Sequence, residues 1–240
     1  MISIIVPTLN EEKVIEETLR RLQPLRKLGH EIIVSDGKSS DKTVELAKPF
    51  ADRIVVDPEP EKKNIARGKN LGAAEARGDL LVFIDADVEI PDTEKFFRKL
   101  AEMFQSNQRL AALTVPIRVR PEAETFGDKI IFGLLNGLYV FSNNVLRVGN
   151  ASGEFQAVRA AAFKNVRGYR EDLVTGEDND LFYRLSRIGR TLVETSLCVL
   201  HSGRRARATG WMKLLFQWIV SGVCVFIFGK SPFKKWRVVR

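Results

Sequence analysis

Four short apolar runs alternate with helical patterns over the first 104 residues of the chain. The runs cover residues 2–6, 31–35, 53–56 and 80–84. Helices are predicted over residues 11–22, from a cap at Ser40 or Asp41 to near Pro49, and over residues 64–76 and 93–104. Strands that are joined by helical crossovers pair in parallel and are covered by helices on both faces. The alternation therefore predicts an α/β fold with a mainly parallel sheet flanked by helices.

The second half of the chain is less regular, which makes the expected sheet mixed. Strands are predicted over residues 111–120, 153–158 and 192–200, and helices over 159–165 and 176–188. Residues 130–148 form an apolar stretch rich in Phe, Gly and Asn. Asn10 is expected to cap the first helix, whose first turn is acidic.

The charge balance points to an anionic partner. The net charge is +8, which suits a nucleic acid, a nucleotide or an anionic membrane. Two cysteines, Cys198 and Cys224, indicate neither a disulfide framework nor a zinc site and favour a reducing compartment. The N-terminus enters a strand pattern directly, so we expect no signal peptide.

The apolar run 80–84 ends in two carboxylates, Asp85 and Asp87, with one residue between them. Alternation along an extended chain directs both to the same side, and the carboxyl end of a strand is where open α/β sheets bind ligands. Two neighbouring carboxylates repel unless a cation lies between them. A hard divalent ion that also holds phosphate oxygens fits this pattern. The alternative is a turn or a helix cap after the strand.

Polar loops follow the first two strands as well. Residues 7–12 (PTLNEE) and 35–43 (SDGKSSDKT) stand at adjacent strand ends, and Asp36 could accept from a base N–H or a ribose hydroxyl. Helix capping is the alternative for Asn10, Ser40 and Asp41. Arg67 and Lys69 open a helix and could hold anions, or could form a solvated basic face.

Three carboxylates, Glu177, Asp178 and Asp180, lie within four residues at the start of a predicted helix. Their repulsion is partly offset by the helix N-terminus, so ordinary N-terminal charge is one interpretation. The other is a general base next to a carboxylate that binds an acceptor hydroxyl.

Residues 211–229 form an apolar tail whose strongly polar members are Lys213 and Gln217. Both flanks are basic, so the charge bias assigns neither end to the outside of a membrane. We expect an interfacial helix in contact with a membrane surface. The alternative is a buried helix, docked on the domain or at a homodimer interface. The flanking cations are Arg204, Arg205, Arg207, Lys230, Lys234, Lys235, Arg237 and Arg240.

Several blocks of the chain resemble, in order and spacing, the family 2 inverting glycosyltransferases, which have the GT-A fold. The resemblance runs from Ser3 to about Arg207. The similar blocks are residues 4–12 (IIVPTLNEE), 34–43 (VSDGKSSDKT), 66–72 (ARGKNLG) with 78–87 (GDLLVFIDAD), and 176–181 (GEDNDL) followed by Arg184 and Leu185.

The resemblance implies a role for each candidate residue. Asp178 would be the catalytic base, Asp87 and His201 would ligate Mn²⁺ or Mg²⁺, and Asp85 would contact ribose or metal-bound water. The acceptor would meet Glu177, Asp180, Arg204 and Arg205. The nucleotide-binding residues would be Pro7, Thr8, Asn10, Glu11, Asp36, Arg67, Lys69 and Asp85.

The resemblance also implies an organisation. Residues 1–112 would form the half that binds the nucleotide-diphosphate sugar, and residues 113–203 the acceptor-binding half of the same domain. Residues 204–240 would form the basic, apolar tail. The QxxRW block of processive synthases is missing, and Ser202 to Arg207 (SGRRAR) stands in its place. The expected protein is a non-processive transferase of a cell-envelope glycan, peripheral on the cytoplasmic face of the membrane, with a glycan or polyprenyl-linked acceptor.

Other functions explain less of the sequence. A phosphatase with an Asp85-Ala86-Asp87-Val88 nucleophile motif would leave residues 7–12 and Asp36 without a role. A nucleotidyltransferase should carry a Gly-rich basic loop near its N-terminus, which residues 7–12 are not. A non-catalytic nucleotide-sugar or membrane-binding module stays open. Nucleic acid is not expected, because the basic residues concentrate around the apolar tail.

Overall fold

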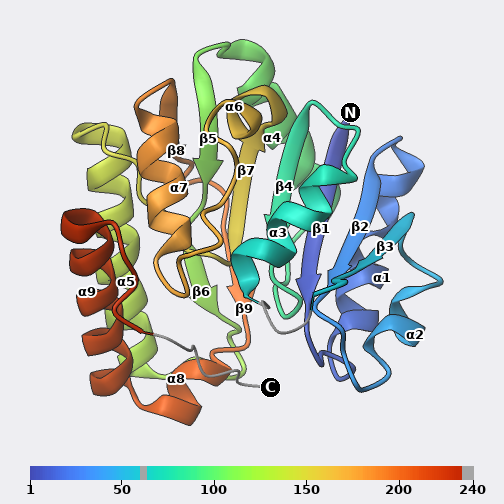
Figure 1. Cartoon of the computed structure of the whole chain (residues 1–240), viewed down its shortest axis with the longest axis horizontal. Helices are drawn as coiled ribbons and strands as arrows, with labels where there is room; N and C mark the ends of the chain where they lie inside the picture. Colours follow the sequence, from blue (N-terminus) through green and yellow to red (C-terminus); the bar gives the residue numbers. More distant parts are fainter. Residues whose placement is uncertain (60–63, 234–240) are drawn as a thin grey trace.

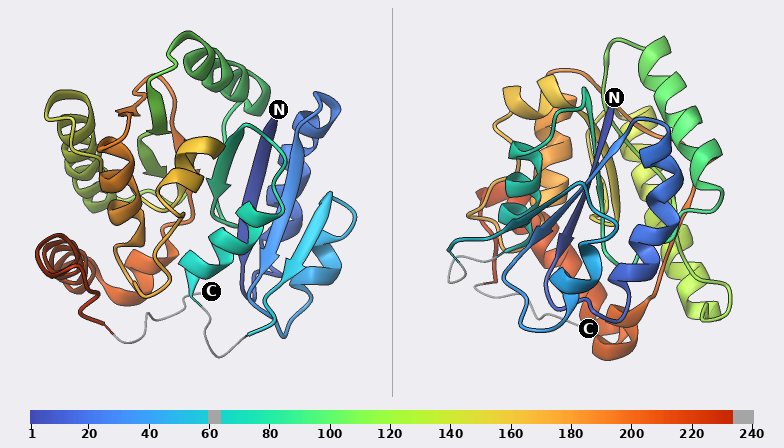
Figure 2. Two further views of the ribbon diagram at one scale, coloured as in Figure 1. Left: turned by 45° about the horizontal axis from the view of Figure 1, so that its top comes forward. Right: turned by 90° about the vertical axis from the view of Figure 1, so that its right-hand side faces the viewer.

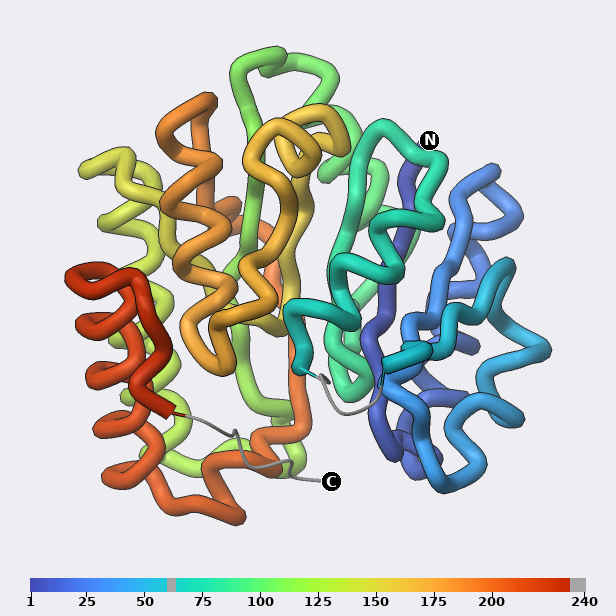
Figure 3. The backbone as a smooth tube through the Cα atoms, in the orientation of Figure 1, coloured from blue at the N-terminus to red at the C-terminus, as the bar shows by residue number. Residues whose placement is uncertain are grey.

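A computed structural model describes residues 1–59 and 64–233 of the chain. A seven-stranded sheet with the order β3-β2-β1-β4-β7-β5-β8 runs through the molecule (Figure 1). The first half of the chain builds the side that carries β3, and the second half builds the side that carries α9 (Figure 3). The strands of this sheet are β1 (Ile2–Thr8), β2 (Glu31–Asp36), β3 (Arg53–Val56), β4 (Leu80–Ile84), β5 (Leu110–Thr114), β7 (Phe155–Arg159) and β8 (Arg190–Val193).

The four strands predicted in the first half are confirmed, and they pair in parallel. β1, β2 and β4 are buried at every position, as expected for strands covered on both faces. The register sets Thr8 beside Asp36, so the ends of β1 and β2 meet at one edge of the sheet. The candidate loops after these strands are therefore neighbours.

β7 enters the sheet antiparallel between β4 and β5. Its first residue, Phe155, therefore lies opposite Ile84 at the carboxyl end of β4. The backbone N–H of Asp85 donates to the carbonyl of Glu154 at 3.2 Å. The second half of the chain thereby brings the segment before β7 to the same edge as the Asp85 loop.

Two predictions of single long strands are wrong. Residues 111–120 divide at Pro116 into β5 and β6 (Ile117–Val119), and residues 192–200 divide into β8 and β9 (Val199–His201). β6 and β9 form a separate two-stranded parallel sheet. Proline lacks the N–H that a continuous ladder requires, which explains the first break. The predicted boundary at residue 112 falls inside β5 and remains a prediction.

Helices cover both faces of the large sheet (Figure 2). One apolar cluster joins the sheet to α1, α2, α4 and the first half of α5, and the other joins it to α3, α6 and α7. The helices are α1 (Ile15–Lys27), α2 (Thr43–Ala47), α3 (Ile65–Ala74), α4 (Thr93–Ser106), α5 (Phe126–Val140) with a π-helical turn (Phe141–Val145), α6 (Ala160–Asn165), α7 (Glu177–Ser186), α8 (Arg204–Thr209) and α9 (Trp211–Phe228).

The predicted helix starts are partly wrong. α1 begins at Ile15 rather than at residue 11, and Asn10 adopts a left-handed φ of 56° and caps no helix. Its amide oxygen instead accepts from the backbone N–H of Ser40 at 2.8 Å. Asp41 accepts from the N–H of Thr43 at 3.0 Å at the start of α2. Asn64 caps α3 by accepting from the N–H of Arg67, so this helix begins at Ile65 rather than at residue 64.

Candidate active site at the carboxyl edge of the sheet

A buried lysine and a carboxylate from opposite halves of the chain meet at the centre of the site. Lys69, from α3, is 1% exposed. Its Nζ donates to Asp178 Oδ1, in the first turn of α7, at 2.7 Å. The same Nζ lies 5.1 Å from the centre of the Tyr169 ring. Burial opposes the charge on Lys69, but Asp178 and its other neighbours outweigh that cost and hold the pKa of Lys69 well above its usual value.

Two further side chains hold the Asp178 carboxylate in place. Gln156 Nε2 donates to Asp178 Oδ1 at 3.1 Å, and the hydroxyl of Tyr169 donates to Gln156 Oε1. Asp178 Oδ2 would lie 2.6 Å from a Cβ at Gly153, so this glycine leaves room for the carboxylate. Oδ1 is thus occupied by two donors, and the close approach at residue 153 requires glycine.

Gln156, Tyr169 and Glu154 were not among the residues predicted from the sequence. The alternation Glu154-Phe155-Gln156 at the start of a strand was the available signal, because it places two polar side chains on one face of an otherwise apolar element. Tyr169 gave no such signal, because it follows α6 in an irregular segment.

Asp85 lies beside this pair and carries a perturbed carboxyl group. Burial raises the pKa of Asp85 to about 7. The ammonium of Lys69 opposes the rise, and the carboxylates of Glu154, Asp87 and Asp178 add to it. A carboxyl group with such a pKa stays partly protonated at neutral pH until a cation arrives. This shift is typical of a functional site.

Asp85→Asn is expected to stabilise the protein at pH 8 by about 1–3 kcal/mol and to change little at pH 4. The pKa of Asp85 in the folded protein lies above its usual value. The stability that the protonated carboxyl contributes is therefore complete at pH values below the usual pKa and is lost as the pH rises to about 7. Urea unfolding at both pH values, without added metal, measures the difference. Asp79→Asn, at an exposed carboxylate, is the control. An equal effect at the two pH values would contradict the assignment.

Glu177 and Asp180 differ from Asp178 in their surroundings. Glu177 is buried, and burial together with the charge of Asp178 raises the pKa of Glu177 well above its usual value, although Lys69 opposes the shift. Asp180 forms ion pairs with Arg184 at 2.6 Å and Arg170 at 3.8 Å. The two residues predicted to bind the acceptor therefore differ: Glu177 is a buried carboxyl with a raised pKa, and Asp180 is already paired with two arginines.

Arg204, at the start of α8, bridges two of the candidate carboxylates. Its guanidinium binds Glu11 through two contacts of 2.7 Å and lies 3.2 Å from Asp87 Oδ2. The hydroxyl of Ser202 donates to the same Asp87 oxygen. The guanidinium thus supplies positive charge between the first of the predicted nucleotide loops and the predicted metal ligand. Arg205, next along α8, lies within electrostatic range of Asp85, Glu154 and Asp87.

His201 is buried at the end of β9, and its ring packs on Phe132 with centroids 4.8 Å apart. The backbone N–H of Gly203 donates to Nδ1 at 3.2 Å. This contact leaves the ring proton on Nε2, a buried nitrogen that has no hydrogen-bond partner among residues 1–59 and 64–233. In this arrangement Nε2 offers no lone pair to a metal. Nδ1 could ligate a metal only after its hydrogen bond with the backbone N–H of Gly203 is broken.

The metal that the resemblance implies fits these residues in part. Asp85 and Asp87 are hard oxygen donors, and Mg²⁺ is commonly held by one or two carboxylates together with substrate phosphates. Among residues 1–59 and 64–233, no group of three or more His, Cys, Asp or Glu side chains could hold a metal by itself. The site therefore suits an ion that arrives with a diphosphate, rather than a metal enclosed by protein ligands.

The predicted nucleotide loops are organised around Asp36. It is buried at the end of β2 and accepts from the Thr8 hydroxyl at 3.1 Å and from the backbone N–H of Ser39 at 2.7 Å. Pro7 is buried next to Thr8 in β1. The amide oxygen of Asn10 accepts from the backbone N–H of Ser40, so the loop after β1 is hydrogen-bonded to the loop after β2. Arg67 forms an ion pair with Asp57 at 3.0 Å beside these loops.

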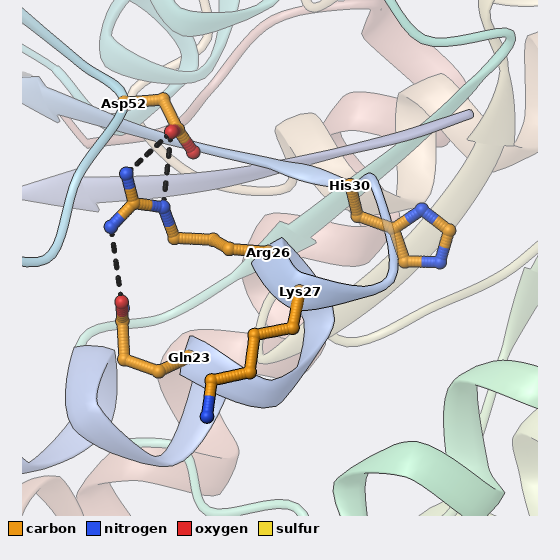
Figure 4. Close-up of a pocket in the computed structure, with 5 residues that line it drawn as sticks. All are labelled: Gln23, Arg26, Lys27, His30 and Asp52. Carbon is orange, nitrogen blue, oxygen red and sulfur yellow. Dashed lines mark hydrogen bonds and ion pairs between the residues drawn. The ribbon is translucent and has the colours of Figure 1, made fainter.

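A separate hollow of about 400 Å³ lies at the opposite edge of the sheet (Figure 4). Its lining includes His30 and Asp52, which precede β2 and β3. Arg26 Nη2 binds Asp52 Oδ1 at 2.7 Å within it. The predicted residues do not lie there, so the carboxyl edge stays the candidate site.

Comparisons with known proteins agree with this arrangement. The model of glycosyl transferase family 2 matches residues 3–167. The succinoglycan biosynthesis protein ExoA of Rhizobium meliloti (strain 1021) is 30% identical over 193 residues, 78% of this chain and 58% of that protein. The poly-beta-1,6-N-acetyl-D-glucosamine synthase of Staphylococcus epidermidis is 28% identical over 190 residues, 77% of this chain and 45% of that protein. The chain thus spans about half the length of these curated relatives.

Solved structures share the fold. A mannosyltransferase from Pyrobaculum calidifontis in complex with GDP-Man and Mn²⁺ superposes with a TM-score of 0.75 at 21% identity, over 96% of this chain and 65% of that one. Glucosyl-3-phosphoglycerate synthase from Mycobacterium tuberculosis, in complex with Mg²⁺ and UDP, gives 0.66 at 22% identity, over 98% of this chain and 81% of that one. The chain belongs to glycosyl transferase family 2 and has the GT-A fold.

Proposed function

We propose that this protein transfers a sugar from a UDP- or GDP-sugar to an acceptor hydroxyl, with inversion at the anomeric carbon. The observation that carries the proposal is the position of Asp178. The Lys69–Asp178 pair places a carboxylate from α7 beside Asp85 at the strand ends, where a ligand is expected. Two relatives of the same fold bind GDP-Man with Mn²⁺ and UDP with Mg²⁺, respectively, which supports a nucleotide-sugar donor for this chain.

The acceptor hydroxyl would lose its proton to Asp178 Oδ2, because Oδ1 already accepts from Lys69 and Gln156. The acceptor oxygen bonds to the anomeric carbon as the bond from that carbon to the diphosphate oxygen breaks. A Mg²⁺ or Mn²⁺ ion held by Asp87 would supply charge neutralisation for the leaving diphosphate. Arg204 and Arg205 add positive charge on the same side, and Asp36 with Thr8 would orient the nucleoside.

The acceptor we propose is a glycan or polyprenyl-linked molecule presented at the cytoplasmic face of a membrane. The support is the apolar helix α9, which has the length and hydropathy of a membrane-spanning helix and in which 17% of the residues are buried. The named products of the two curated relatives are polysaccharides, which is consistent with a cell-envelope glycan. One of those relatives is a polymer synthase, so the non-processive character of this chain stays a prediction.

A donor panel tests the proposal. Isothermal calorimetry with UDP- and GDP-sugars, with and without Mn²⁺, is expected to select one donor, whose binding is strengthened by the metal. Transfer to a lipid-extract acceptor, followed by anomeric analysis, then tests inversion. Binding without any transfer or donor hydrolysis would favour the non-catalytic module instead. Retention of the anomeric configuration would overturn the single displacement.

A further inference from the structure

Helix α5 exposes one continuous apolar face. The exposed side chains recur every three or four residues along α5 and the π-helical turn, and Phe126 and Leu134 are 78% and 71% exposed. A surface helix normally turns such a stripe toward the core. We call this stripe the α5 face: Phe126, Ile130, Leu134, Leu138, Phe141 and Val145.

Helix α9 repeats the pattern at the same end of the molecule (Figures 1 and 2). Met212 and Phe226 are 84% and 69% exposed, and the residues between them keep the helical spacing. We call this stripe the α9 face: Met212, Phe216, Ile219, Val223, Phe226 and Ile227. The two helices meet where Trp211 contacts Asp128 and Phe132 of α5. Two apolar stripes at one end of the molecule are more than the scattered apolar residues of an ordinary surface.

Contacts on the inner side of α9 fix which face is exposed. The Trp211 indole donates to Asp128 Oδ1 in α5 at 3.0 Å. The hydroxyls of Ser221 and Thr175 lie 2.9 Å apart. Arg170 Nη2 donates to the carbonyl of Gly229, after the last turn, at 2.9 Å. Because α9 is attached to the domain at both ends, it lies along the surface and cannot cross a bilayer while these contacts hold.

The charges around the two apolar faces indicate which partner binds there. Residues 204–240 contain no acidic residue, and the one acid within residues 126–151 is the buried Asp128. Exposed cations border both faces, among them Lys129, Arg147, Lys213 and Lys230. A symmetric contact with a second copy of the chain would bring these cations close to one another. An anionic lipid surface pairs with them and takes up the apolar faces as well.

We propose that the α5 face and the α9 face dock together on an anionic lipid bilayer, with both helices lying in the plane of the interface. The inner sides of the same helices reach the active site. Tyr139 of α5 is partly buried and lies within electrostatic range of Glu154 and Asp178. Val225 of α9 packs against Gly176, where an added Cβ would lie 3.0 Å from Val225 Cγ2. On the proposed function, the bilayer therefore adjoins the acceptor side of the site.

Flotation with vesicles tests the docking. The full chain is mixed with phosphatidylcholine vesicles that contain or lack 30% phosphatidylglycerol, about the fraction that gives a strongly anionic surface. Wild type is expected to float with the anionic vesicles. Leu134→Glu with Leu138→Glu should lower its partition coefficient at least about tenfold, because two side chains lose apolar burial and gain charge. Phe216→Glu tests the α9 face in the same way.

Leu28→Glu is the matched control, because Leu28 is also an exposed leucine but lies after α1, outside both faces. It should float like wild type. Thermal melting confirms that each variant is folded, and donor binding by calorimetry should not change. Flotation of the α5 variant at the wild-type level would overturn the proposal. So would a dimer that the α5 variant converts to monomer without any loss of flotation. Donor binding and flotation are separate readouts, so either proposal can fail alone.

Discussion

Asp178→Asn is expected to lower the rate of sugar transfer by about 10²–10⁴-fold, the range that a positioned general base contributes. Asparagine keeps an oxygen that can accept from Lys69 and Gln156, so the local structure should persist. It cannot take a proton from the acceptor hydroxyl. Initial rates at saturating donor, together with donor affinity by calorimetry, measure the effect. The affinity for the donor is expected to change far less than the rate.

Asp172→Asn is the control for this experiment, because Asp172 is exposed and pairs with Arg170 outside the Lys69 cluster. That variant should transfer sugar at the wild-type rate. Full activity of Asp178→Asn would show that the proton goes elsewhere. An acceptor phosphate, which needs no base, would give the same result, so the acceptor is to be identified before the variant is interpreted.

Lys69→Met is expected to lower the free energy of unfolding by about 3–5 kcal/mol at pH 8, because it leaves buried carboxylates without their cation. Lys69 is the cation whose charge opposes the raised pKa of both Asp85 and Glu177. Without it, both groups keep their protons to higher pH, and ionising them in the folded protein costs more. The loss of stability should therefore be largest above pH 7 and smaller at pH 5.

Urea unfolding at pH 5 and pH 8 measures this loss, and Lys48→Met, at an exposed position, should change stability by less than about 0.5 kcal/mol. A loss of equal size at both pH values would mean that Lys69 acts through packing rather than charge. Methionine keeps most of the buried aliphatic volume, so the variant separates these two effects.

The sequence predicts the parallel half of the sheet well, because its strands are continuous apolar runs bounded by polar loops. Asp85, Asp87 and Asp36 follow such runs directly, so the edge that they share follows from strand direction alone. Asp178 is predicted from a different signal, a cluster of acidic residues at the start of a helix. Its contact with Lys69 is not predictable in this way, because the two residues are 109 positions apart and no local pattern specifies the pairing.

The second half resisted prediction for physical reasons. The insertion of β7 between β4 and β5 depends on long-range pairing, and the short strands β6 and β9 carry too few residues to show a period. Asn10 suits a helix cap in isolation, but its side chain binds the loop at Ser40 instead. The stretch 130–148 was recognised as apolar, yet its period does not tell whether the stripe faces the core or the outside.

The bridge from Arg204 to Glu11 joins residues 193 positions apart. During synthesis the N-terminal strands emerge first and can begin to pair with each other. Glu11 is buried in the folded protein. Arg204, the arginine that pairs with it, is synthesised only after most of the chain. Closing so long a loop is a late and entropically costly event in folding. On the proposed function, a nascent chain would therefore hold an incomplete donor site until the segment that leads into α9 has been translated.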